Sequence, residues 1–263
     1  MTADHSARQR PDEPLTQVAP RVYRLGDDLV SFYLVEDGGR FTVVDAGFSS
    51  HYSRLGDALA RLGHTLRDVR AVLVTHGHPD HIGLAERIRV EAAADVWVHA
   101  ADAPILAAPR LANAHSKPES GLISYALRRP SMLGMPLRMA RRGAFRVTPV
   151  LKTATFEARQ TLAVPGEPVA IPVPGHTAGS SAFHFPGHGV VFTGDALVTH
   201  DGITGLSGPR IVCRAFTRNS AAALNSLDTL AALDVPLVLP GHGQPFTGGT
   251  ADAAEQARKA GIS

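Results

Sequence analysis

Four side chains that can bind a metal ion lie within the segment His76-Gly77-His78-Pro79-Asp80-His81. The segment directly follows an apolar run at 71–75, which predicts a buried strand. Imidazole and carboxylate groups suit zinc, iron or manganese. A tight loop at a strand end can point alternate side chains toward one spot, so His76 and His78 could share one metal while Asp80 and His81 face a second. The alternative is a polar loop that only contacts solvent, which the buried strand before it argues against.

Three further ligand-type residues occur in the same context, each just after an apolar run and beside a glycine. They are His176 in PVPGHTAGS, Asp195 in VFTGDAL and His242 in VLPGHGQPF. One histidine in a glycine-rich turn is more often a surface residue, so each is weak alone. Together the four strand-end segments supply seven ligands, which is enough for two metal ions with open coordination positions.

Composition narrows the chemistry further. The single cysteine, Cys213, excludes an intramolecular disulfide and a cysteine-rich zinc site, and its apolar context (RIVCRAF) predicts a buried, inert thiol. The net charge of +2 does not indicate a nucleic-acid-binding protein. No segment approaches the roughly 20 apolar residues of a membrane span, and the N-terminus has no signal-peptide core. We therefore expect a cytoplasmic protein that contacts neither membranes nor nucleic acid.

The hydrophobic pattern predicts one domain over 21–263, preceded by a disordered N-terminal arm at 1–20. Strands alternate with helices in two similar halves, which indicates a layered α/β fold. Residues 100–155 interrupt this alternation and form an insert. The predicted strands are 22–25, 30–35, 41–45, 71–75, 96–99, 169–173, 181–185, 190–193 and 237–239, and the predicted helices are 52–62, 83–93, 220–233 and a final helix that begins at Thr250.

The chain resembles the metallo-β-lactamase superfamily, whose signature is HxHxDH followed by separate His, Asp and His residues. The resemblance covers roughly 20–250 and implies a four-layer αββα sandwich with the metals between the ends of the two sheets. It implies that one metal is held by His76, His78 and His176, that the other is held by Asp80, His81 and His242, and that Asp195 bridges them. The expected cofactors are therefore two divalent ions, zinc in the first place, with iron and manganese as alternatives.

Asp45 in TVVDAG matches an aspartate that supports the site in that superfamily, although a turn residue after a strand is an equal reading. Two cations about 3.5–4 Å apart lower the pKa of a shared water toward about 7. The resemblance thus implies a hydroxide that bridges the metals and attacks a carbonyl or phosphoryl centre. Asp80 would orient this hydroxide as well as bind metal, so Asp80 and Asp195 are the candidate catalytic residues. No serine or cysteine nucleophile is required.

Differences between this sequence and the known subfamilies of the superfamily limit the reactions that we expect it to catalyse. Asp195 stands where β-lactamases typically carry Cys or Ser, which argues against antibiotic hydrolysis. Glyoxalase II proteins share the seven ligands but add a C-terminal helical domain, for which the residues after His242 are too few. Lactonases carry a tyrosine where this chain has Val198. We expect hydrolysis of an ester, thioester or lactone. The alternatives are a phosphodiesterase acting on RNA or nucleotides, a β-lactamase-like enzyme, and a non-catalytic metal-binding protein.

The insert is basic and rich in methionine. Residues 121–156 contain no acidic side chain. Such a segment could be a lid that accepts an acyl-bearing or anionic small molecule, a homodimer contact, or a solvated face. Tyr125 and Arg138 of the insert and His200 beyond it are candidate pocket residues, with packing of Tyr125 and a surface position of His200 as alternatives. The cations and methionines of this stretch are Arg128, Arg129, Arg138, Arg141, Arg142, Arg146, Lys152, Met132, Met135 and Met139.

Overall fold

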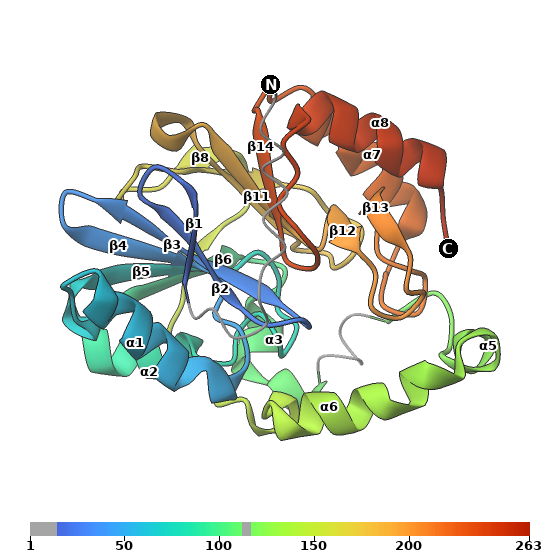
Figure 1. Cartoon of the computed structure of the whole chain (residues 1–263), viewed down its shortest axis with the longest axis horizontal. Coiled ribbons are helices and arrows are strands. Elements are labelled where there is room, and N and C mark those ends of the chain that lie inside the picture. The colour runs from blue at the N-terminus through green and yellow to red at the C-terminus, as the bar shows by residue number, and fades with distance from the viewer. Residues whose placement is uncertain (1–14, 112–116) are drawn as a thin grey trace, which may run out of the picture.

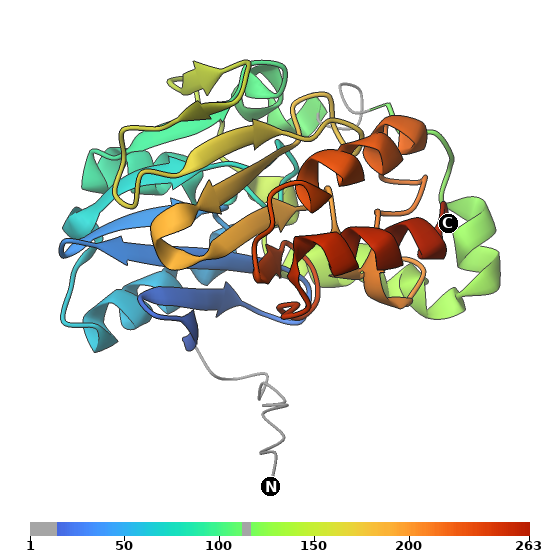
Figure 2. The same ribbon diagram turned by 90° about the horizontal axis from the view of Figure 1, so that it is seen from above.

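In the computed structural model, which describes residues 15–111 and 117–263, two β-sheets face each other and helices cover their outer sides (Figures 1 and 2). The first sheet has seven strands in sequential order. Its first four strands form an antiparallel meander, and the remaining three continue in parallel. The strands are β1 (Thr16–Ala19), β2 (Val22–Gly26), β3 (Ser31–Asp37), β4 (Arg40–Val44), β5 (Val69–Leu73), β6 (Asp95–His99) and β7 (Ala154–Phe156).

The second sheet has five strands in the order β14-β11-β10-β9-β8, and a separate hairpin joins β12 and β13. Its strands and the hairpin are β8 (Gln160–Thr161), β9 (Val169–Pro172), β10 (Ser181–Phe185), β11 (Val190–Gly194), β14 (Leu237–Pro240), β12 (Val198–His200) and β13 (Ser207–Arg210). The α-helices are α1 (Tyr52–Arg61), α2 (Ala85–Ala92), α3 (Ala103–Ala107), α5 (Ile123–Arg128), α6 (Met135–Arg141), α7 (Ser220–Ala231) and α8 (Gly249–Ala260).

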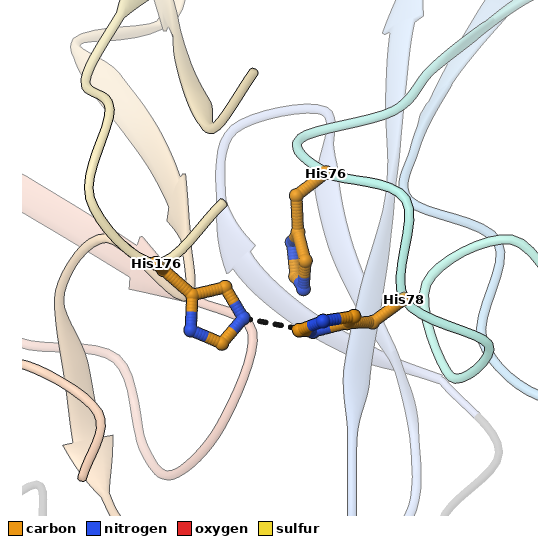
Figure 3. A group of neighbouring side chains, drawn as sticks. All are labelled: His76, His78 and His176. Carbon is orange, nitrogen blue, oxygen red and sulfur yellow. Dashed lines mark hydrogen bonds between the residues drawn. The ribbon is translucent and has the colours of Figure 1, made fainter. Parts of the chain in front are cut away.

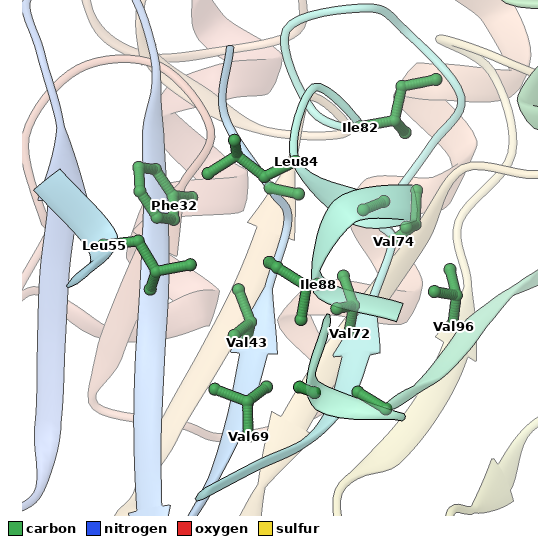
Figure 4. Close-up of a cluster of buried hydrophobic side chains, with 14 of the residues drawn as sticks. Phe32, Val43, Leu55, Val69, Val72, Val74, Ile82, Leu84, Ile88 and Val96 are labelled. Carbon is green, nitrogen blue, oxygen red and sulfur yellow. The ribbon is translucent and has the colours of Figure 1, made fainter. Parts of the chain in front are cut away.

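Three apolar layers hold these elements together. Leu55 of α1 and Ile88 of α2 pack on Val43 and Val72 of the first sheet (Figure 4). Between the two sheets lies an aromatic layer that includes Phe183 and Phe192. A third cluster joins the second sheet to α7 and α8. The expected αββα sandwich is therefore confirmed. Truncating a fully buried leucine such as Leu55 to alanine typically costs about 2–5 kcal/mol.

The prediction of disorder up to residue 20 is wrong for its last part. Thr16–Ala19 forms β1, which pairs antiparallel with β2 around a turn in which Arg21 has a φ of 59°. Leu15 and Val18 pack against the core, which gives this short edge strand an apolar anchor that its polar neighbours conceal in the sequence. Residues 1–14 of the predicted N-terminal segment lie outside the described residues. The short strands β7, β8, β12 and β13 were also not predicted.

The insert at 100–155 contains α3, α5 and α6 and returns to the first sheet at β7. We call residues 121–146 the arm. In Figure 1 the arm runs along the lower edge of the molecule, from beneath α1 and α2 to the neighbourhood of the C-terminus. In the described ranges, no helix has the length and apolar character needed to cross a membrane.

Candidate metal centre

The seven predicted ligands follow the carboxyl ends of four strands, one in the first sheet and three in the second. His76, His78, Asp80 and His81 follow β5, while the other three follow β9, β11 and β14. β4, β5 and β6 run parallel, as do β11 and β14, so the loops after them emerge on common sides of the two sheets. The sandwich thereby brings together residues that are far apart in the chain.

Three histidines form the first group. Ring nitrogens of His76, His78 and His176 all lie within 4.8 Å of one another. Figure 3 shows their imidazoles converging, His76 and His78 from one loop and His176 from the opposite side. His176 Nε2 and His78 Nδ1 are 2.9 Å apart. Two such nitrogens share one proton as a hydrogen bond, or both offer lone pairs to a cation.

Asp80, His81 and His242 form the second group, again within 4.8 Å. Asp80 Oδ2 lies 3.7 Å from His81 Nε2 and 3.5 Å from His242 Nε2. These are the two triplets that the resemblance implied. Asp80 and His242 are partly exposed, whereas His81 is fully buried, so this group forms the accessible side of the cluster.

Asp195 lies between the two groups. Its carboxylate oxygens are 3.8 Å from His76 Nε2, 3.5 Å from His176 Nε2, 3.5 Å from His81 Nε2 and 3.2 Å from His242 Nε2. A single carboxylate thus faces nitrogens of both triplets. This arrangement is the one required of a bridging ligand.

The electrostatics separate the two groups. Burial lowers the pKa of His76 and His176 well below the ordinary value, and it also lowers that of His78, so these rings stay neutral and keep lone pairs. Burial acts in the same direction on His81, but the carboxylates of Asp45, Asp195 and Asp80 outweigh it and raise its pKa to about 9. The acidic side of the cluster therefore attracts positive charge.

His242 and Asp195 show this attraction most clearly. Burial lowers the pKa of His242, but the charge and hydrogen bond of Asp195 outweigh it and raise that pKa to about 10. Burial raises the pKa of Asp195, yet His242 and His81 hold it well below its usual range. Asp195 is therefore ionised, as a metal ligand must be.

Two acceptors behind the cluster fix histidine rings. Asp45 Oδ2 lies 2.8 Å from His81 Nδ1, and Asp45 Oδ1 accepts the Thr75 backbone N–H at 2.8 Å. His242 Nδ1 donates to the Leu29 carbonyl at 2.5 Å. In both rings Nδ1 holds its hydrogen on an acceptor behind the cluster, so Nε2 faces the cluster and can bind a metal that displaces its proton. Asp45 was singled out in the sequence, whereas a backbone carbonyl such as that of Leu29 has no sequence signal.

Gly241 shows why a glycine precedes a ligand. A Cβ at this position would lie 2.6 Å from Asp195 Oδ1 and 2.7 Å from His81 Cε1. Any larger residue would displace Asp195, which lies between the triplets, and His81 of the second triplet. The glycine is thus required by space and not by an unusual backbone angle.

The three candidate pocket residues have other partners. Tyr125 packs with Met132 and Cys213 and donates its hydroxyl hydrogen to the Ser263 carbonyl at 2.8 Å, which is the packing role left open by the sequence. Arg138 pairs with Asp28, and His200 Nδ1 lies 3.0 Å from Ser207 Oγ. Burial raises the pKa of the Cys213 thiol to about 12, so it is inert as expected.

The arm nevertheless borders the cluster. Arg142 Nε donates to Asp27 Oδ2 at 2.5 Å, in the turn that also carries Leu29, and Arg129 Nη1 donates to the Gly202 carbonyl at 2.8 Å in the β12–β13 hairpin. Thr199 of that hairpin donates its backbone N–H to the His242 carbonyl at 3.0 Å. The arm therefore connects the two turns that flank His242.

The model of the Metallo-beta-lactamase superfamily matches residues 25–242. The chain belongs to this superfamily. Together with its metal-site geometry and its relatives, this makes it a metallo-hydrolase with a His/Asp cluster suited to divalent ions. A metallo-beta-lactamase family protein from Thermus thermophilus is 26% identical, with a TM-score of 0.66 over 91% of this chain and 78% of that one.

Two curated relatives are similar in sequence. The probable metallo-hydrolase YflN of Bacillus subtilis is 24% identical over 90% of this chain and 92% of its own length. A hydroxyacylglutathione hydrolase of Fuscovulum blasticum is 32% identical over 80% of this chain, and the match spans 61% of that protein. These similarities support the general class of hydrolase.

Proposed function

We propose that this superfamily member hydrolyses an ester, thioester or lactone bond with two divalent metal ions, zinc in the first place. The observation that carries the proposal is the position of Asp195, whose carboxylate faces nitrogens of both triplets. A site for one metal would need only one of these groups. The proposed ligands are His76, His78, Asp80, His81, His176, Asp195 and His242.

Buried polar atoms without a hydrogen-bond partner support the binding of a cation at this site. Among the described residues, His76 Nε2 and Asp195 Oδ1 are buried and lack a hydrogen-bond partner. Leaving such groups unsatisfied costs about 1–3 kcal/mol each. A cation between them would satisfy both. The donors are nitrogen and oxygen without thiolate, which suits zinc, manganese or iron.

When bound, a pair of divalent cations supplies an acidified water and polarises the oxygen of the bond that is attacked. The protein's residues supply the rest. Asp80 is the accessible carboxylate of the cluster, and we assign to it the orientation of the attacking water. Asp45 and the Leu29 carbonyl hold His81 and His242 in the correct tautomer.

The acyl bond is favoured by two features. Three curated relatives are named hydroxyacylglutathione hydrolase, and that name denotes cleavage of an acyl–sulfur bond. Asp195 also supplies a carboxylate where the superfamily's β-lactamases typically carry Cys or Ser. Val198 is buried in β12 and offers no hydroxyl to a lactone carbonyl, so thioesters and esters rank before lactones.

A substrate panel tests this proposal. The purified chain is loaded with zinc, manganese or iron and assayed on an acyl thioester, an aryl ester, a lactone, an aryl phosphodiester and a β-lactam. We expect turnover on at least one acyl substrate, with about two metal ions per chain by elemental analysis. Faster turnover of the phosphodiester or the β-lactam than of every acyl substrate would overturn the assignment, as would less than one metal per chain.

A further inference from the structure

Asp102 joins two of the loops that carry the candidate ligands. Its side chain is fully buried. Asp102 Oδ2 accepts the Gly77 backbone N–H at 2.9 Å and the Thr177 hydroxyl at 2.7 Å, while Oδ1 accepts the Gly179 backbone N–H at 2.8 Å. Gly77 lies between His76 and His78, and Thr177 follows His176. One carboxylate therefore connects both sides of the three-histidine group.

Asp102 connects the ligand loops in place of capping its own helix. Asp102 is the N-cap residue of α3, where an aspartate usually accepts a backbone N–H of its own helix. Its side chain makes no such capping bond. The carboxylate is instead directed away from α3 toward the ligand loops. The sequence alone favours the capping role, which is why the cross-connection could not be predicted.

The glycines of both loops fit closely around this segment. A Cβ at Gly179 would lie 2.7 Å from Asp102 Cγ, and a Cβ at Gly77 would lie 2.7 Å from Cβ of Ile105, which is also in α3. Neither glycine can be replaced without moving a ligand loop away from the segment that runs from Asp102 to Ile105. The two loops are thus built to approach this carboxylate at hydrogen-bond distance.

We propose that Asp102 is a positioning residue that sets the separation between the His76–His78 loop and the His176 loop, and thereby the affinity of the three-histidine group for its metal. The inference rests on the metal site of the proposed function. Three hydrogen bonds to a charged acceptor resist separation of the loops better than neutral bonds would. Without them, His176 would be free to shift relative to His78, and a metal site tolerates only small shifts of its ligands.

Cobalt binding by the full-length protein tests the proposal. The dissociation constants of the two sites are measured by competition with a chelator, and the visible spectrum reports the ligand geometry. In Asp102→Asn, an amide NH2 must face at least one of the three donors. We expect one of the two cobalt ions to bind about 10–100-fold more weakly, with an altered spectrum. Thr177→Val removes a single bond and should shift the same site in the same direction by less.

Asp201→Asn is the matched control. Asp201 is also a buried aspartate that accepts three backbone N–H groups, those of Ile203 and Thr204 on Oδ1 and that of Cys213 on Oδ2, but all three lie in or beside the β12–β13 hairpin. This variant should lower the melting temperature of the metal-free protein and leave the cobalt affinity of the three-histidine group at the wild-type value, because the hairpin contacts His242 of the other group. The pair separates an effect on the metal site from a general loss of stability.

The outcomes distinguish this inference from the proposed function. If Asp102→Asn loses stability as Asp201→Asn does and binds both cobalt ions as tightly as wild type, the inference is wrong and the proposed function stands. If Asp102→Asn does not fold, wild-type cobalt affinity in Thr177→Val overturns the inference. If the wild-type chain binds less than one cobalt ion, the proposed function fails and the inference fails with it.

Discussion

The metal-ligand loops and the arm at 121–146 border the same part of the molecule but are held in different ways. The ligand loops after β5 and β9 are fixed by buried hydrogen bonds to Asp45 and Asp102. The arm is held by its packing around Tyr125 and by charged contacts that are partly buried or exposed, and it exposes large apolar side chains. These are Leu122, Ile123, Leu127, Leu133, Leu137 and Phe145.

This difference indicates which properties each region can determine. Buried, charge-assisted bonds in a low dielectric fix positions closely, which metal chemistry requires. Surface ion pairs contribute roughly 0–1 kcal/mol and permit movement. We infer that the loops determine whether the reaction occurs and that the arm determines which substrates reach it. Substitutions in the two regions should therefore affect different kinetic constants.

The largest effect is expected from removing a ligand. His78→Ala or Asp195→Ala should lower kcat by more than about 100-fold, beyond what loss of a supporting partner costs, because no neighbouring group can replace the ligand. Steady-state kinetics and elemental analysis on the metal-loaded variants check this. His188→Ala is the control, since His188 lies in an exposed turn. Equal losses in all three variants would contradict a specific role for the cluster.

Asp45→Asn should have the next largest effect. The charge that faces His81 Nδ1 is removed while the shape is kept, so metal affinity should fall about 10–100-fold. Competition with a chelator measures this. An unchanged affinity would show that Asp45 acts only in the turn, which its φ of 57° and its bonds to Thr75 would then explain.

Most of the candidate site could be predicted from the sequence because the proposed ligands have two properties that a sequence displays. They are rare in type for buried positions, and they follow apolar strands whose ends must meet. His176 and His242 are recognisable for this reason even though they lie far from His76. Asp102 displays neither property, because its partners are backbone groups and a hydroxyl in loops distant along the chain.

The same reasoning explains which parts of the fold the sequence did not predict correctly. β1 was missed because it depends on pairing with β2 and on a few apolar contacts, such as those of Leu15 and Val18, which make no periodic pattern in the sequence. The insert was recognised because it interrupts the alternation of strands and helices, but the path of the arm within it could not be predicted. That path depends on individual contacts, such as Arg142 with Asp27 and Tyr125 with Ser263, which no periodic pattern encodes.

Low pH should weaken the contacts by which Asp27 holds the arm, because they depend on the ionised carboxylate of Asp27. Burial raises the pKa of Asp27, but the hydrogen bond to His51 and the charges of His51 and Arg142 outweigh it and hold that pKa below its ordinary value. The unfolded pKa is about 3.9, so the stabilisation is complete above that pH and is lost as the pH falls below it toward the lower folded pKa. Asp27→Asn should therefore be less stable than wild type at pH 7, with a difference that shrinks below about pH 4. Urea unfolding at both pH values measures this, and a difference independent of pH would contradict it.

The smallest effect is expected on the KM, where substitutions of two neighbouring arginines of the arm should differ. Arg142 donates to Asp27 in the turn that holds Leu29, whereas Arg141 is exposed and has no ion-pair partner in the described part of the chain. Arg142→Ala should raise KM by a few fold and leave kcat and metal content nearly unchanged, because the turn keeps its other bonds while the arm is less restrained. Arg141→Ala should change neither constant.

Kinetics of this pair on acyl substrates of increasing chain length test the assignment of the arm to substrate access. If Arg142→Ala lowers kcat and loses one metal ion, the contact acts on His242 through Leu29, and the arm belongs to the metal site after all. If both variants match wild type for every chain length, the arm does not limit access, and its exposed leucines await another explanation. A rise in KM that grows with chain length in Arg142→Ala alone would place the acyl group against the arm, since only an acyl chain long enough to reach it would sense its position.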